Sequence, residues 1–133
     1  MASTSTEEVL GQGQVAFDVP ARADSLQLLR LGAADRAASL GLGTDTIDRA
    51  RVVVDELAGI LVTAAPNTRL RLVITGRDGG AGLHFDGRVP HPSPAPEVDL
   101  VVVELLDLCA GRDAWDLHAA GGWLSFQAMV GER

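Results

Sequence analysis

Side chains that could take part in chemistry are scattered along this chain of 133 residues. The three histidines lack cysteine or carboxylate companions at the spacing of metal ligands, which argues against a metal site: His84, His91 and His118. Ser125 has no base arranged beside it to activate a nucleophile. The single cysteine, Cys109, lies in an apolar run without a nearby histidine, so the sequence predicts an inert core position. Carboxylates and arginines are the remaining candidates.

Two carboxylates and a group of arginines occupy positions that could matter. Glu56 lies at the polar edge of an amphipathic helix, where a glutamate is most often solvated. Asp86 precedes a glycine at the end of a strand, which is primarily a turn signal. The arginines on two neighbouring helices could present a basic stripe to an acidic protein partner: Arg30, Arg36, Arg49 and Arg51.

The composition narrows the class of protein. Hydrophobic residues make up 47% of the chain and charged residues 22%, which are ordinary proportions for a globular domain. A net charge of −7 works against binding to nucleic acid, because phosphate binding depends mainly on clustered basic residues. No apolar run approaches the roughly 20 residues of a membrane span, and the N-terminal residues lack the features of a signal peptide. The sequence therefore predicts a cytoplasmic protein without membrane contact.

The elements that must position these residues follow from local patterns. Residues 1–12 are small, polar and acidic, and we expect a flexible lead-in before a single domain over residues 13–133. Alternating apolar residues predict a strand over 14–20. Helical spacing predicts one helix from Asp24 or Ser25 to the glycines at 41 and 43, and a second from Thr44 to the break at Pro66.

The second half of the chain begins with a predicted hairpin and ends with another. The strands and turns are expected at 68–75, 76–80, 82–86, 113–118 and 123–130. A proline-rich loop over 91–96 leads into an apolar segment, 97–109, whose length favours a helix over a strand. We expect one helical face to carry its apolar stripe: Val98, Val101, Val102, Leu105 and Cys109. The fold class is therefore α+β, a two-layer sandwich with about three helices on one face of a mixed or antiparallel sheet.

Two segments, 17–30 and 50–57, resemble the anti-sigma-factor serine kinases of bacteria. That family belongs to the larger group with the ATP-binding domain of Hsp90 and the histidine kinases. The predicted order of elements is also the order in this family. The resemblance therefore implies a histidine-kinase/Hsp90-like ATPase fold over nearly the whole domain.

The first family motif pairs a glutamate base with an asparagine four residues later that holds magnesium at the ATP phosphates. Glu56 matches the glutamate, and the resemblance implies that it would be the catalytic residue. Ile60 falls at the asparagine position. Because isoleucine has no oxygen to offer a metal ion, this position implies that the magnesium ligand is lost.

The two other motifs bind the adenine and the phosphates in the family. Asp86 is the counterpart of the aspartate that takes the adenine amino group, but Arg88 and Pro90 stand where glycines would serve. The glycine-rich phosphate lid corresponds to Ser93–Glu97, whose prolines lack amide donors and whose glutamate repels phosphate. Cofactor binding is therefore not expected, with ATP and magnesium as the alternative.

These features together predict an anti-sigma-like regulator of transcription rather than an enzyme. It would bind a sigma factor or its antagonist without ATP turnover. The alternative is an active or residual serine/threonine kinase that binds ATP and phosphorylates an anti-sigma antagonist. A third possibility is a domain that forms a homodimer and has no sigma-factor target.

Overall fold

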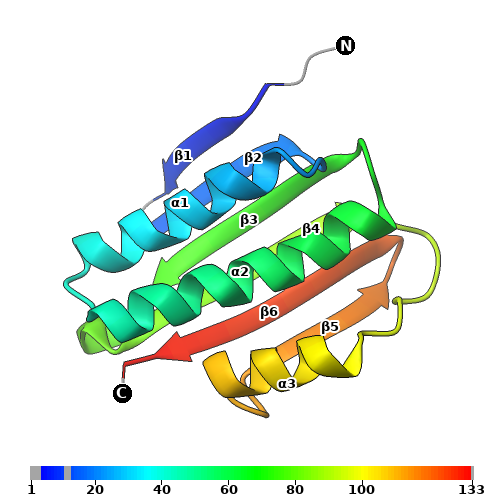
Figure 1. Cartoon of the computed structure of the whole chain (residues 1–133). Coiled ribbons are helices and arrows are strands. Elements are labelled where there is room, and N and C mark those ends of the chain that lie inside the picture. Colours follow the sequence, from blue (N-terminus) through cyan, green and yellow to red (C-terminus); the bar gives the residue numbers. More distant parts are fainter. Residues whose placement is uncertain (1–3, 11–12, 133) are drawn as a thin grey trace.

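The computed structural model describes residues 4–10 and 13–132. Figure 1 labels the elements in chain order, which are β1 (Thr6–Leu10), β2 (Gln14–Pro20), α1 (Ser25–Ser39), α2 (Thr44–Ala64), β3 (Arg69–Gly76), η1 (Asp78–Gly80), β4 (Gly82–Pro90), α3 (Leu100–Cys109), β5 (Trp115–Ala120) and β6 (Trp123–Gly131).

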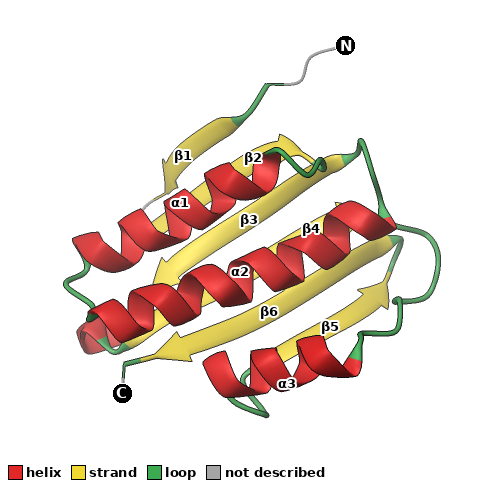
Figure 2. Cartoon of the chain, viewed as in Figure 1, coloured by secondary structure: helices red, strands yellow, loops and turns green. Residues whose placement is uncertain are grey.

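The strands form one six-stranded sheet in the order β1-β2-β3-β4-β6-β5. Every neighbouring pair in this sheet is antiparallel. The three helices lie on one face, with α1 and α2 side by side along the sheet and α3 over the β5–β6 edge (Figure 2). The predicted α+β sandwich is confirmed at this level, and its sheet is antiparallel.

The core lies between the helices and the sheet because both carry apolar residues at the period of their element. On β3, Leu70, Leu72 and Ile74 are fully buried, while the residues between them face away from the helices. On α2, Leu57 and Leu61 are fully buried one turn apart. Burial of each such side chain stabilises the fold by about 1.5–3 kcal/mol.

The turn after α1 contains a glycine that the sequence pattern marked as a helix stop. Gly41 has a φ of 76°, the left-handed conformation that glycine adopts without a steric cost. This turn lets the amide of Leu42 donate to the carbonyl of Ala37 at 3.1 Å. The chain can then reverse into α2, so that the two helices pack antiparallel (Figure 1).

Three predicted boundaries differ from the structure. Residues 6–10, which the sequence left without secondary structure, form β1 and pair with β2 from Thr6↔Asp18 to Leu10↔Gln14. β4 continues to Pro90 because it pairs with β6 along its whole length. The apolar segment is a helix as predicted, but α3 begins at Leu100, where the side chain of Asp99 accepts from the amide of Val101 at 2.8 Å.

The inward face of α3 agrees with the expectation in part. Val102 and Leu105 of the predicted stripe pack partly buried against the core. Val101, however, is 72% exposed, and Leu106, which was not predicted to face inward, is fully buried. The buried position predicted for Cys109 is confirmed. None of the helices in the described part of the chain is long and apolar enough to cross a membrane.

Candidate binding groove

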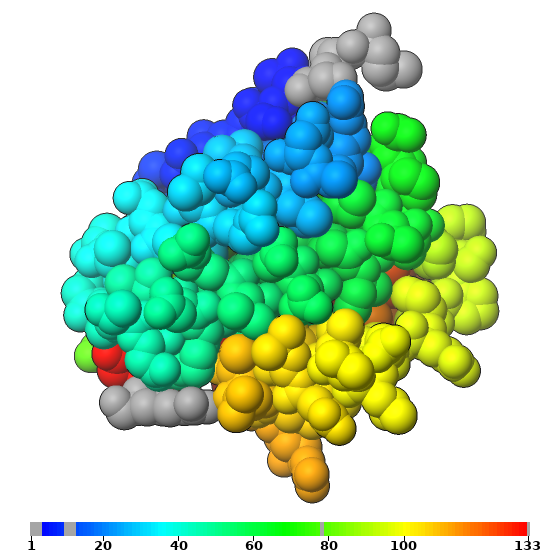
Figure 3. Space-filling view, viewed as in Figure 1, coloured from blue at the N-terminus to red at the C-terminus, as the bar shows by residue number. Residues whose placement is uncertain are grey.

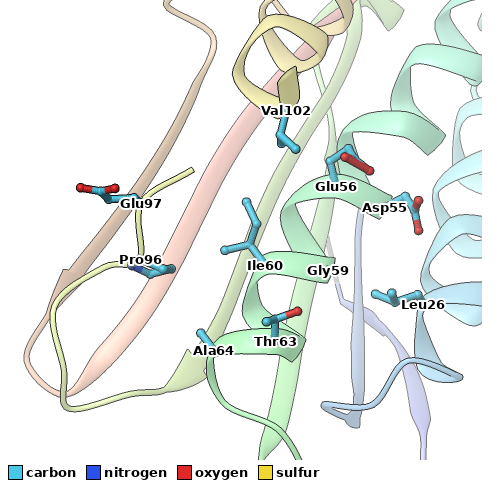
Figure 4. Close-up of a pocket in the computed structure, with 10 residues that line it drawn as sticks. All are labelled: Leu26, Asp55, Glu56, Gly59, Ile60, Thr63, Ala64, Pro96, Glu97 and Val102. Atoms are coloured by element: carbon cyan, nitrogen blue, oxygen red, sulfur yellow. The ribbon is translucent and has the colours of Figure 1, made fainter. Parts of the chain in front are cut away.

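A groove of about 450 Å³ opens between α2, α3 and the loop of residues 91–99 that joins β4 to α3. The surface is hollowed where these three segments meet (Figure 3). Ten residues line the groove, and all of them are labelled in Figure 4. They include Glu56 and Ile60, so the structure brings together the two positions that the first motif singled out.

The spacing along α2 explains why these residues share the groove. Glu56, Ile60 and Thr63 are separated by four and three residues, which places them on one side of a helix. Gly59 lies among them, and a Cβ added there would meet no atom within 4 Å. The missing side chain at this position leaves the groove open.

The floor of the groove is apolar and its rim is acidic. Ile60 of α2 faces Val102 of α3 across the hollow, with Pro96 on the loop beside them (Figure 4). Glu56 stands on α2 at one side, and Glu97 stands on the loop at the other, with its carboxylate turned outward in this view. No lysine, arginine or histidine is among the described residues that line the groove.

The third rim carboxylate, Asp55, is partly neutralised. It lies 3.4 Å from a guanidinium nitrogen of Arg30 on α1, so it pairs across the two helices rather than with Arg51 on its own helix. Glu56 and Glu97 form no ion pair with any residue that the structure describes. Two unneutralised carboxylates therefore flank the apolar floor.

The side chains at the motif positions of the groove differ from those that ATP with magnesium requires. Ile60 supplies no oxygen to a metal ion, and the carboxylates of Glu56 and Glu97 would repel phosphate groups. The loop contributes prolines, which have no amide hydrogen to donate: Pro92, Pro94 and Pro96. In the described residues, no group of three or more histidine, cysteine, aspartate or glutamate side chains is arranged to hold a metal ion.

Asp86 lies far from this arrangement, on the other face of the sheet. Its neighbours in β4, Phe85 and Gly87, are buried beneath the helices, so alternation points Asp86 to the helix-free face. There it shares a shallow hollow with Arg71 and Arg88. The structure therefore does not bring Asp86 together with Glu56, which corrects the expectation that both would serve one nucleotide site.

The turn expected at Asp86 is also replaced by continuous strand. Gly87 pairs with Phe126 of β6, and a Cβ at this position would overlap the Phe126 ring. The glycine is therefore required for close packing of an aromatic side chain in the core. The same residue type served as a turn signal in the sequence, because local pattern does not distinguish these two uses of glycine.

Arg49 is part of the interior, which corrects its assignment to an exposed basic stripe. The residue is only 7% exposed. Its guanidinium donates to the carbonyl of Cys109 at 3.0 Å and to the carbonyl of Gly131 at 2.6 Å. It also pairs with Asp45 at 2.8 Å, as the four-residue spacing predicts. Arg49 therefore joins α2 to the ends of α3 and β6.

The other arginines of the expected stripe are also separated from one another. Arg36 donates to the carbonyl of Gly13 at 2.8 Å, and Arg30 is held by Gln27 and Asp55. Of these four arginines, Arg51 alone is exposed and forms no ion pair or side-chain hydrogen bond with the residues that the structure describes. The helix surface next to the groove therefore does not present four free positive charges.

Glu132 completes the contacts around Arg49, and sequence analysis did not identify it. Its carboxylate accepts from the hydroxyl of Thr46 at 2.7 Å and from the amide of Gly43 at 2.8 Å, at the start of α2. These hydrogen bonds hold the pKa of the Glu132 carboxyl below its ordinary value. No local signal could reveal this cap, because its partners lie 86 and 89 residues away.

Comparison with known proteins gave no match, either to the models of protein families or to curated proteins. The features of this chain that bear on function are therefore the groove and the residues that resemble the anti-sigma-factor kinases.

Proposed function

We propose that this protein is an anti-sigma-like regulator of transcription that binds a sigma factor or its antagonist without ATP turnover. One observation carries the proposal: Glu56 and Ile60 line the same groove at the spacing of the family motif, yet the groove has no metal ligand at position 60. The groove offers an apolar floor and carboxylates, which suit a protein partner better than a nucleotide.

The proposed mechanism needs no catalytic step. Binding to a sigma factor covers a surface that RNA polymerase core also requires, so the two compete by mass action. Release of the sigma factor would follow when an antagonist occupies the regulator. The resemblance in segments 17–30 and 50–57 supplies this partner class, and the proposed histidine-kinase/Hsp90-like ATPase fold supplies the shape that presents the groove.

The rival function is a residual serine/threonine kinase, and one observation favours it. The side chain of Glu56 lines a cavity, as a catalytic base would. A kinase would still require a different oxygen to replace the one missing at Ile60. Isothermal titration calorimetry with ATP and magnesium separates the two functions, because saturable binding supports the kinase and absent binding supports the regulator.

The decisive experiment measures binding of the purified protein to sigma factors and their antagonists from the same genome. We expect a saturable one-to-one interaction whose affinity is unchanged by added ATP and magnesium. Ile60→Asn restores a side-chain oxygen and is the matched control. We expect it to remain unable to bind ATP, because the rim carboxylates and loop prolines still oppose phosphate. If the folded wild-type protein binds none of these sigma factors and antagonists, the proposal is overturned.

A further inference from the structure

We infer that the groove binds a basic, apolar segment of the protein partner, with an arginine or lysine side chain placed between large apolar residues. The assignment of the occupant as a protein rests on the proposed function. Its charge and polarity follow from the groove itself. This inference reverses the expectation that the helix surface recognises an acidic partner.

Apolar surface is open both in the groove and on α3 near it. Ile60 and Val102 are only partly buried, so they keep apolar surface open within the hollow. Along α3, Leu100 is 77% exposed and Val101 is 72% exposed, next to the groove wall formed by Val102. Exposed apolar side chains gathered around a hollow are characteristic of a site that another protein covers.

The charge around this surface is negative on two sides. Glu56 and Glu97 flank the floor from α2 and from the loop (Figure 4), and neither forms an ion pair with a described residue. The negative charge of Asp55 is partly offset by the nearby guanidinium of Arg30. Opposite charge on the partner is attracted to such a rim, whereas a carboxylate or phosphate on the partner is repelled.

Of the arginines expected to form a basic stripe, Arg30 offsets part of this negative charge, at Asp55. Arg49 is buried within α2, and Arg36 is bonded to the backbone of Gly13, on the side of α1 that faces β2. The net charge of −7 adds a long-range attraction for basic groups. A partner that approaches the α2–α3 side therefore meets carboxylates around an apolar hollow.

A pair of synthetic peptides tests this inference on the full-length protein. Both are amphipathic helices of about 14 residues, or four turns, with identical leucines and with arginine in one replaced by glutamate in the other. Binding is followed by NMR of the ¹⁵N-labelled protein, with the amide of Gly59 as the groove reporter and that of Gly41, in the turn before α2, as the remote reporter. We expect the arginine peptide to shift Gly59 saturably and Gly41 little, and to bind more weakly at high salt. The glutamate peptide should not bind.

Two variants locate the site. Gly59→Leu fills the groove without meeting another atom at Cβ, and it raises helix propensity, so the protein should remain folded. We expect it to lower the affinity for the arginine peptide at least about tenfold. The double variant Glu56→Gln with Glu97→Gln should lower this affinity about five- to tenfold. The control, Asp48→Asn with Glu104→Gln, makes the same charge change at exposed positions outside the groove and should change affinity less than about twofold.

Three results would overturn the inference: equal binding of the two peptides, full affinity in Gly59→Leu, or an equal loss in the control pair. The partner experiment separates this inference from the proposed function. If a sigma factor binds wild-type and Gly59→Leu equally, the groove inference fails and the proposed function stands. If the arginine peptide binds in the groove but no sigma factor or antagonist binds the protein, the proposed function fails instead.

Discussion

Replacement of Arg49 by methionine should destabilise the fold more than any other arginine substitution on α2. Methionine keeps much of the aliphatic volume but removes the donors to the carbonyls of Cys109 and Gly131 and the ion pair with Asp45. Because Asp45 is mostly exposed, its loss of a partner costs little. The cost arises from the two carbonyl hydrogen bonds of a buried charged group, at about 1.5 kcal/mol or more each.

The expected total is therefore about 3 kcal/mol of unfolding free energy. For a domain of this size, that loss lowers Tm by about 10 °C. Urea unfolding followed by tryptophan fluorescence measures it, since Trp115 and Trp123 report on the β5–β6 hairpin beside Gly131. The midpoint should fall without a change in the slope of the transition.

Arg51→Met is the matched control, because Arg51 lies two residues further along the same helix and is exposed. It should change stability by no more than about 0.5 kcal/mol. Arg49→Lys should fall between the two, since an ammonium keeps the charge but lacks the planar fork that reaches both carbonyls. Equal midpoints for Arg49→Met and Arg51→Met would refute the assignment of Arg49 as a structural contact of the interior.

The remaining predictions concern other parts of the molecule. Glu132→Gln should lower stability near neutral pH and make little difference in acid. A carboxyl with a lowered pKa stabilises the fold at pH values above its unfolded pKa of 4.5, and this contribution is lost as the pH falls through the folded pKa. Parallel pH titrations of Tm for the wild type and the variant measure this difference. Gly87→Val should destabilise the protein by about 1–3 kcal/mol in urea unfolding, because the added side chain overlaps Phe126. Asp86→Asn should leave both the equilibrium constant of unfolding and the partner affinity within about twofold of wild type, because Asp86 lies on the face opposite the groove. A large loss of partner binding in this variant would place the partner on the helix-free face instead.

The types and order of the elements from residue 14 onward could be read from local patterns. Alternation at 14–20 and the helical stripe of α2 each arise within one element, so a short window contains the information. β1 was missed because Thr6–Leu10 carries few apolar residues and depends on its register with β2. The burial of Leu106 and the exposure of Val101 on α3 were missed for a related reason, since a mostly apolar helix gives little preference for one inward face.

The candidate groove could be predicted only in part. The pair Glu56 and Ile60 was visible because four-residue spacing on a helix guarantees a shared side. The contribution of Glu97 from the loop and of Val102 from α3 depends on how distant segments pack against α2. The face of the sheet on which Asp86 lies depends on the register of β4, because a shift of one residue would have moved its side chain to the other face.

The sequence by itself determined that this chain forms an α+β domain with an acidic surface and an isoleucine four residues after Glu56. Tertiary structure alone decided which charges remain free. Arg49 is buried by contacts with Cys109 and Gly131, which are 60 and 82 residues away, whereas Glu56 keeps an open groove beside it. The physical reason is that local periodicity sets secondary structure, but the net charge that a partner meets depends on pairings between segments that only the folded chain brings together.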